Sequence, residues 1–484
     1  MHTCIVSHIR RLWPLSCLLI ALAVSVCAFT PISGTASRGP WREGLPLRVG
    51  APEPVRQATV LSPYGPGFEV ELIHRFCQST PCSPEWTPVS DKEEGFALLK
   101  KGEIDVLVGF WGDEPEQADP ENMEEGPEIV AGKAYAHFNP IRIKGAAAPK
   151  PTPRQQDSGS SGTPVLETLT EVFNALPFIQ SQSSAPPPIA SGEDPPFPIF
   201  SLMTEGDETS AEDILLVDPA SYALWLPFLG DVDTAQITQP TPFRWFWRDD
   251  DDEMLGERLA AFWTDRARAE ELRELTERYF GFLPRKLRQR DILELAETLS
   301  AHLPKYEKFI LNAARETGVP PLLLVAAIYQ ESRFDPSAVS ETKVRGIMQL
   351  TSTTAKMLDV DRRDPEQCIL GGARYLKDLK DRVADKADNE WDRWFMALAA
   401  YNQGMSNLNR TIKLSKEIGG SGDTWADLKK AFPLSTTCRG LEARSFVEKI
   451  RYYHFILHGL VALAPAESEN LAPLLGLALA HNAF

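Results

Sequence analysis

The sequence has few of the residues that bind metal ions. Its 484 residues include 7 Cys and 8 His, and these stand apart, with no C-x-x-C pair and no cluster of histidines. Protein zinc sites are built from such closely spaced ligands. We therefore expect no metal, and the sequence indicates no other cofactor.

Basic residues are also scarce relative to acidic ones. The chain carries 50 Lys and Arg against 67 Asp and Glu, a formal net charge of −17. Binding of nucleic acid depends on clustered Lys and Arg that neutralise phosphates, so we expect no nucleic acid as the main partner. A glycan remains open as a partner, because it is bound through hydrogen bonds and stacking rather than bulk charge.

The N-terminus holds a long apolar run. Arginines at positions 10–11 precede an apolar stretch over 12–29, and Val26-Cys-Ala28 offers small residues for cleavage. This order is typical of a secretory signal peptide, and the run is short for a stable membrane span. We predict export with removal of residues 1–28. A lipid anchor on Cys27 is the alternative, although the valine before it fits lipid attachment poorly.

Four cysteines remain after this cleavage, and export permits disulfides among them. Cys77 and Cys82 are close enough in sequence to close a small loop. Cys368 and Cys438 can pair or stay as buried thiols. We interpret all four as structural.

The chain is too long for one hydrophobic core, and its first half alternates strand and helix patterns. Strands are expected at 47–51, 104–109, 213–217 and 243–247, and helices at 67–76, at 94–102 and from the acidic run 249–252 to about 270. Such alternation predicts an α/β domain with a parallel sheet. Pro- and Ser-rich linkers interrupt it at about 146–198, around one possible helix at 165–179.

The pattern becomes helical from residue 287 onward. Helices are expected at 291–302, 306–316, 366–383, 390–402 and 445–463, and another begins at Val319-Pro-Pro321 and carries Glu331. Residues 464–484 form an apolar tail of unclear role. The second half is therefore expected to be all-α.

Glu331 stands at the end of a helix that is apolar almost all round from Leu322 to Tyr329, so that helix should be buried. Burial disfavours the charged form of a carboxyl, and the partial negative charge of a helix C-terminus acts in the same direction. A protonated Glu331 can serve as a general acid on a glycosidic oxygen. From the helix alone, a surface glutamate that marks its end is the better interpretation.

The block that begins with Glu331 and three further blocks change that balance. The chain has Glu331-Ser-Arg-Phe-Asp-Pro336, Gly346-Ile-Met-Gln-Leu350, Ala400-Tyr-Asn-Gln-Gly404 and Glu442-Ala-Arg-Ser-Phe-Val447. In kind and order they resemble the "ESxxxP", "GLMQL", "AYNxG" and "ExxxYV" blocks of Slt-type lytic transglycosylases, specifically of the membrane-bound lytic murein transglycosylase F type. The resemblance covers about residues 300–460.

This resemblance implies a multidomain fold. Residues 287–463 would form an all-α lysozyme-like catalytic domain, and residues 45–282 an α/β domain like a periplasmic solute-binding protein of family 3. The strand at 47–50 and the block 95–109 resemble that second family. Its amino-acid receptors usually place an arginine after the strand, and none follows Gly109 here, which puts amino-acid binding in doubt. A muropeptide or another small ligand is the expected partner of this sensing or tethering domain.

The implied reaction is non-hydrolytic cleavage of the β-1,4 bond between N-acetylmuramic acid and N-acetylglucosamine in peptidoglycan, with a 1,6-anhydro product. The resemblance makes Glu331 the single acid and base, since the nucleophile belongs to the substrate, unlike in two-carboxylate glycosidases. The expected substrate-binding residues are Ser340, Gly346, Met348, Gln349, Tyr401, Asn402 and Glu442. A hydrolytic muramidase and a non-catalytic receptor for wall fragments are the alternatives.

Two positions depart from the family pattern. Lys343 replaces a glycine, which costs about 1 kcal/mol or more if the position needs a positive φ. Phe446 replaces a tyrosine and lacks its hydroxyl. The resemblance also implies a place in the periplasm of a Gram-negative bacterium, peripheral on the outer membrane.

Overall fold

The computed structural model describes residues 41–52, 62–89, 92–110, 127–138, 141–144, 214–217, 233–236, 241–249, 254–284, 289–387, 389–435 and 439–463. The expected signal peptide (1–28), the linkers at about 146–198 with their possible helix, and the tail (464–484) lie outside these residues. So does Cys438. The description below concerns the remaining parts of the chain.

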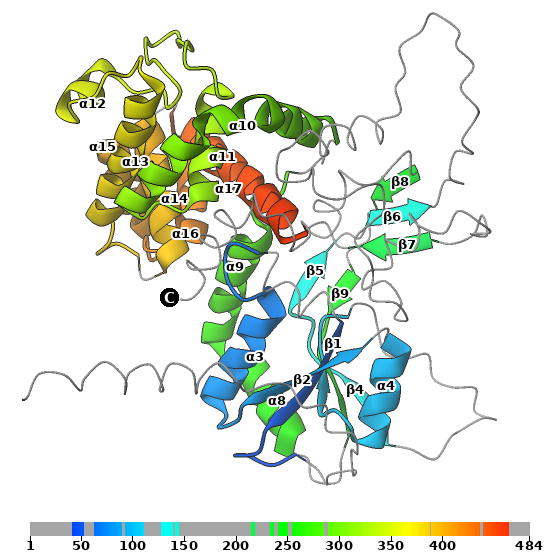
Figure 1. Cartoon of the computed structure of the whole chain (residues 1–484). Helices are drawn as coiled ribbons and strands as arrows, with labels where there is room; N and C mark the ends of the chain where they lie inside the picture. The colour runs from blue at the N-terminus through cyan, green and yellow to red at the C-terminus, as the bar shows by residue number, and fades with distance from the viewer. Residues whose placement is uncertain are drawn as a thin grey trace, which may run out of the picture.

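A five-stranded mixed sheet organises the N-terminal half (Figure 1). Its strand order is β2 (Pro84–Val89), β1 (Leu47–Pro52), β3 (Val106–Leu107), β10 (Phe246–Arg248) and β4 (Ile129–Ala131). Strand β1 is parallel to β2 and β3, whereas β10 is antiparallel to β3 and β4. The α/β class and the strands predicted at 47–51 and 104–109 are therefore confirmed, the second limited to Val106–Leu107. The prediction of a parallel sheet is wrong, because β10 enters it antiparallel to its neighbours.

Helices cover both faces of this sheet. Helices α3 (Phe68–Ser79), α8 (Met254–Thr264) and α9 (Arg266–Phe280) share a core with Val49, Val106 and Val108. Helix α4 (Lys92–Lys101) packs with Leu107 on the other face. Alternate residues of a strand point to opposite faces, so the neighbours Val106 and Leu107 enter different cores.

Two expected elements are divided in the structure. The strand predicted at 243–247 is split into β9 (Thr241–Phe243), which pairs with β5 (Ala136–Phe138), and β10 in the main sheet. The helix predicted to run to about 270 ends at Thr264, whose hydroxyl donates to the carbonyls of Ala260 and Ala261. Asp265 separates the two helices, and α9 begins at Arg266.

A smaller antiparallel sheet has the order β7 (Ile214–Val217), β6 (Ile141–Lys144) and β8 (Asp233–Gln236). Strand β7 confirms the strand predicted at 213–217. The predicted bond between Cys77 and Cys82 is present. Cys368 is a buried free thiol.

The C-terminal half is helical, as predicted. It comprises α10 (Gln289–Thr317), α11 (Pro321–Ser332), α12 (Ser352–Met357), α13 (Pro365–Arg382), α14 (Glu390–Gln403), α15 (Met405–Glu417), α16 (Trp425–Ala431), a 3-10 turn (Phe432–Leu434) and α17 (Arg439–Leu463). The sequence analysis did not identify α12, α15 or α16. No helix among the described residues is long and apolar enough to cross a membrane.

Helix α10 corrects the prediction of two helices at 291–302 and 306–316, because it continues through Pro304. A proline inside a helix costs about 3 kcal/mol. The helix buries Leu299 and Leu303 before Pro304, and Tyr306 and Ile310 after it, all in the same core. Packing on both sides therefore outweighs the local penalty.

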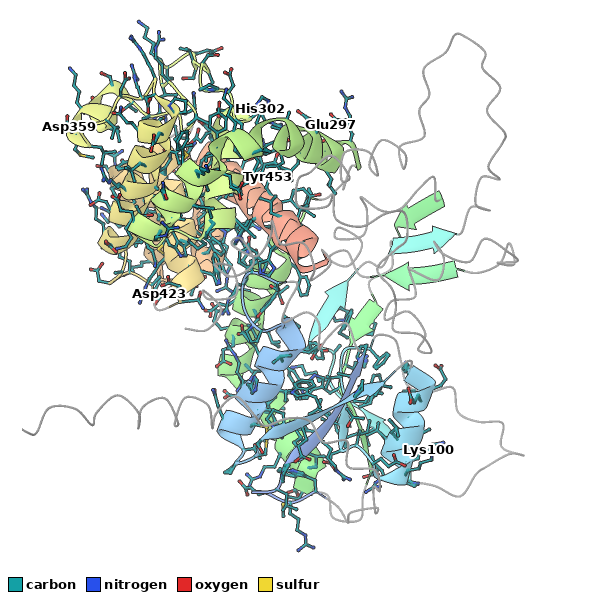
Figure 2. The ribbon with its side chains drawn as sticks, in the orientation of Figure 1. Lys100, Glu297, His302, Asp359, Asp423 and Tyr453 are labelled. Atoms are coloured by element: carbon teal, nitrogen blue, oxygen red, sulfur yellow. A yellow bond between two sulfur atoms is a disulfide. The ribbon has the colours of Figure 1, made fainter. Side chains whose placement is uncertain are left out.

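Helix α11 lies at the centre of the helical core, and every residue from Pro321 to Tyr329 is buried. It packs against α10 and α17. Tyr453 of α17 (labelled in Figure 2) packs edge-on against Tyr329, with ring centroids 4.8 Å apart. The predicted burial of this helix is confirmed, and it places the end of α11 beside α17.

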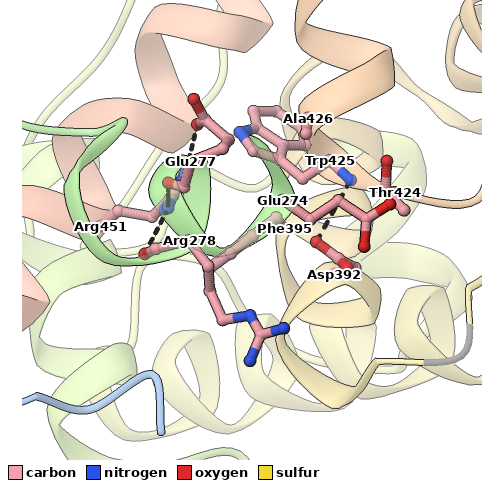
Figure 3. A pocket seen from close by; sticks show the side chains of 9 residues that line it. All are labelled: Glu274, Glu277, Arg278, Asp392, Phe395, Thr424, Trp425, Ala426 and Arg451. Atoms are coloured by element: carbon pink, nitrogen blue, oxygen red, sulfur yellow. Dashed lines mark hydrogen bonds and ion pairs between the residues drawn. The ribbon is translucent and has the colours of Figure 1, made fainter. Parts of the chain in front are cut away.

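Helix α9 joins the two halves. Arg451 of α17 is fully buried and donates to the side chain of Glu277 (2.9 Å) and to the carbonyls of Glu277 and Arg278 near the end of α9 (2.7 and 2.9 Å). These groups line a small pocket together with Asp392 and Trp425 (Figure 3). None of the residues that line this pocket belongs to the four sequence blocks.

Candidate active site

Glu331 is the penultimate residue of α11 and is half-buried. The helix stops because Arg333 and Phe334 adopt the left-handed conformation, with φ of 54° and 64°, a common way to end a helix. Phe334 is fully buried and stacks on Tyr306. The cost of the positive φ is thus offset by burial of the phenylalanine, and the chain leaves the helix directly after Glu331.

Asp335 has the turn role that the sequence analysis expected. Its carboxylate accepts from the backbone N–H and the hydroxyl of Ser337 at 2.8 and 2.6 Å. These bonds lower the pKa of Asp335. A carboxylate engaged in this way stays ionised and closes a turn.

The carboxyl of Glu331 is in a different environment. Burial raises its pKa to about 8, and the negative charge of Glu442 adds to the effect. Within the described part of the chain it makes no hydrogen bond and no ion pair. Glu331 therefore holds a proton at neutral pH and has no partner within these residues. Burial is the cause that the sequence analysis expected, whereas the contribution of Glu442 comes from the tertiary structure.

A short loop follows Glu331 and folds back on itself. Arg345 forms isolated antiparallel β-bridges with both Val339 and Leu350. The N–H of Gly346 donates to the carbonyl of Ala338 (3.1 Å). Gly346 has a φ of 85°, and a Cβ there would lie 2.0 Å from the carbonyl oxygen of Arg362. Only glycine fits this close approach.

Gln349 and Met348 hold this loop in place. The Gln349 side chain donates to the carbonyls of Ala338 (3.0 Å) and Gly346 (2.9 Å). The side chain of Met348 is buried, and a Cβ on Gly372 would lie 2.7 Å from its Cε. Core packing, which the sequence left open for methionine, is thus what its side chain does.

Tyr401 connects the loop with Glu331. Its hydroxyl donates to the Met348 carbonyl (2.8 Å). Burial raises its pKa, and the nearby charge of Glu331 raises it further. Beside it, Asn402 Oδ1 and both amide atoms of Gln403 are buried without a hydrogen-bond partner among the described residues. The structure therefore brings the second and third sequence blocks together around Glu331.

Glu442 reaches the site from α17. It lies exposed in the first turn of that helix, which packs against α11. Its charge affects the pKa of Glu331, so the fourth block also lies near the acid. Phe446, where the family has tyrosine, is buried.

Ser340 and Lys343 form an exposed turn of the loop. The Ser340 hydroxyl lies 2.9 Å from the Thr342 hydroxyl and accepts weakly from the N–H of Val344 (3.3 Å). Lys343 has a φ of 64°, so this position does adopt the positive φ that the sequence analysis considered as a condition. A lysine there costs about 1 kcal/mol relative to glycine.

Two residues that support the loop were missed from sequence. Arg362 donates through Nη1 to the carbonyls of Lys343 (3.1 Å) and Leu350 (2.9 Å). The Cys368 thiol faces backbone N–H groups of the loop, first that of Met348, although burial raises its pKa to about 11. Neither residue has a local sequence signal, because both act on a segment that is distant in the chain.

The buried acid-bearing helix, the glycine loop and the tyrosine define a class of protein. Residues 308–421 match the family model of the transglycosylase SLT domain.

Full-length relatives narrow this class. A membrane-bound lytic murein transglycosylase F of Photobacterium profundum is 31% identical over 407 residues, which cover 80% of this chain and 75% of the relative. Proteins of the same name from Vibrio campbellii and Shewanella frigidimarina are 29% and 28% identical, over 85% and 84% of this chain and 79% and 87% of the relatives. The chain belongs to the family of membrane-bound lytic murein transglycosylases F.

Solved structures give distant matches to parts of the chain. An inactive mutant of the lytic transglycosylase Slt from Pseudomonas aeruginosa is 18% identical, with a TM-score of 0.26 over 42% of this chain and 34% of that chain. An ancestral arginine-binding protein bound to glutamine is 17% identical, with a TM-score of 0.30 over 50% of this chain and all of that chain.

Proposed function

We propose that Glu331 is the single acid and base of a lytic transglycosylase that cleaves the β-1,4 bond between N-acetylmuramic acid and N-acetylglucosamine and leaves a 1,6-anhydro end. The chain is a lytic transglycosylase by its family. The observation that carries the residue assignment is the raised pKa of Glu331, about 8, at a carboxyl with no partner among the described residues.

The first step uses the proton of Glu331. At neutral pH the carboxyl is protonated and donates to the glycosidic oxygen, so that the bond to C1 breaks and the leaving sugar departs with a hydroxyl. Positive charge develops at C1 and the ring oxygen. Glu331 is left as a carboxylate.

The second step returns the proton. The Glu331 carboxylate takes the proton of the muramoyl C6 hydroxyl while O6 bonds to C1, which closes the 1,6-anhydro ring. Burial and the charge of Glu442 disfavour the carboxylate, and this makes Glu331 a stronger base for that hydroxyl. No water is consumed, and the enzyme ends in its starting protonation state.

The other site residues are proposed to bind and orient the glycan strand. Ser340, Gly346 and Gln349 belong to the loop that follows Glu331; Met348, whose side chain is buried, would contribute by shaping that loop from the core, and Tyr401 fixes it through the Met348 carbonyl. Asn402 offers a buried oxygen without a partner among the described residues. Glu442 would contact the strand from α17.

The remaining assignments follow from the sequence and the family. Residues 45–282 would form the solute-binding-like domain that senses or tethers, with a muropeptide or small ligand, and residues 287–463 the catalytic domain. The homologues are named membrane-bound, which implies a bacterial envelope location. Export through residues 1–28 to the periplasm and peripheral attachment to the outer membrane are the finer proposals.

Digestion of purified sacculi tests the assignment. Wild type should release anhydromuropeptides, each lighter by one water than the hydrolytic product, and Glu331→Gln should release none. Glu366→Gln, an exposed carboxylate in the first turn of α13, is the matched control and should act like wild type. Reducing ends in the mass spectrum would identify a hydrolytic muramidase instead. Full activity of Glu331→Gln would refute the role of Glu331.

A further inference from the structure

Lys343 adopts a backbone conformation that disfavours its own side chain. Its φ of 64° lies in the left-handed region, where glycine is free of strain and lysine is not. Its N–H donates to the Ser340 carbonyl (2.9 Å), so it closes the turn that begins at Ser340. A strained residue at a proposed site raises the question of what its side chain provides.

The loop does not need the lysine side chain to keep this shape. Arg362 holds the Lys343 carbonyl (3.1 Å) and also the Leu350 carbonyl (2.9 Å). Gln349 ties Ala338 to Gly346 through its amide. Each of these contacts is made with a backbone group, and each would persist if residue 343 were glycine.

The ammonium group has no partner among the residues that the structure describes. Lys343 is exposed and forms no ion pair there, and neither does Arg345, two residues further along the same loop. In a chain of net charge −17, the loop that follows the proposed acid thus carries two cations without an ion pair among the described residues. The benefit that offsets the strain at Lys343 is therefore to be sought outside the chain.

We propose that Lys343 is a specificity-determining residue that binds a carboxylate of the stem peptide on the muramoyl residue. This inference rests on the proposed function. The N-acetylated sugars are neutral, whereas the peptide on the lactyl group carries carboxylates, so a cation on this loop distinguishes a peptide-bearing strand from a bare one. Arg345 adds a second positive charge to the same loop.

The magnitude follows from the exposure of Lys343. Exposed ion pairs are weak and are screened by salt, so we expect a preference of about three- to fivefold for the anionic substrate. The preference should decline as the salt concentration rises. It should leave the anhydro product unchanged, because Lys343 acts on recognition and not on the proton transfers.

The test combines a change in the enzyme with a change in the substrate. Sacculi are compared before and after their carboxylates are converted to amides with a carbodiimide and ammonia, and the readout is the ratio of kcat/KM on the two substrates. Full-length wild type and Lys343→Arg should both favour the unmodified sacculi. Lys343→Asn lacks the charge but tolerates a left-handed φ, and its ratio should fall to about one.

The outcomes separate this inference from the proposed function. If Lys343→Asn keeps the wild-type ratio, the carboxylate contact is wrong while the assignment of Glu331 stands. If Lys343→Arg loses the preference as fully as Lys343→Asn does, charge is not what the position supplies, and the inference also fails. Activity of Glu331→Gln on unmodified sacculi would instead refute the proposed function.

Discussion

Replacement of the proposed acid should make the protein more stable, and the size of the effect can be worked out from its pKa. Glu331 has a pKa raised from 4.5 to about 8 in the folded chain. Between these two values the folded state binds a proton that the unfolded state has released. Stability therefore falls as the pH rises from about 4.5 to about 8 and is constant above that. Glu331→Gln cannot ionise and lacks this loss.

Within this pH window the free energy of unfolding falls by about 1.4 kcal/mol for each pH unit. At pH 7 the free energy of unfolding of wild type should therefore be about 3 kcal/mol lower than that of Glu331→Gln. For a domain of this size, 1 kcal/mol shifts Tm by about 2–4 °C. Glu331→Gln should therefore unfold about 6–12 °C above wild type at pH 7, and the two proteins should converge near pH 4.5.

The assay is thermal unfolding of both full-length proteins at several pH values between 4.5 and 8.5, followed by circular dichroism at the helical signal. Glu366→Gln, exposed on α13, controls for the loss of a surface charge and should follow wild type. A Tm difference between Glu331→Gln and wild type that does not change with pH would refute the reasoning. Glu331 would then be ionised at neutral pH, and the general-acid step would lose its basis.

Three other perturbations follow from the same contacts. Glu442→Gln removes one of the two causes that raise the pKa of Glu331, so the alkaline limb of the pH–rate profile should move to lower pH; an unmoved limb would contradict it. Gly346→Ala places a Cβ 2.0 Å from the Arg362 carbonyl oxygen at a positive φ, so activity on sacculi should fall by at least about tenfold with far-UV circular dichroism retained. Arg451→Ala removes a fully buried side chain and leaves the carbonyls of Glu277 and Arg278 without their donor, while Lys429 still pairs with the Glu277 carboxylate; chemical denaturation should show a loss of about 2–4 kcal/mol, against little change for the exposed Arg382→Ala.

Local patterns predicted much of the fold. The apolar run from Leu322 to Tyr329 is a buried helix, and Asp364 caps α13 by accepting from the N–H of Gln367 (2.8 Å), as Asp-Pro indicated. Pro304 misled the prediction, because proline is a strong local signal and the packing that overrides it involves distant residues. The break between α8 and α9 after Thr264 is not revealed by the periodicity of the sequence.

The candidate site divides in the same way. Glu331, Gln349 and Tyr401 could be singled out because each stands in a block of characteristic residues. Arg362 and Cys368 could not be singled out. Arg362 supports the loop from the turn before α13 and Cys368 from α13 itself, and neither stands in a local pattern.

By itself the sequence determined the class of the two halves and the buried helix that ends in Glu331, because these depend on neighbours within a few residues. Only the tertiary structure decided that Glu442 lies close enough to raise the pKa of Glu331 and that Tyr401 holds the loop through the Met348 carbonyl. It also showed that Arg451 joins α17 to α9. Each of these contacts spans tens of residues or more of the chain, and charge and hydrogen bonding act through space rather than along the sequence.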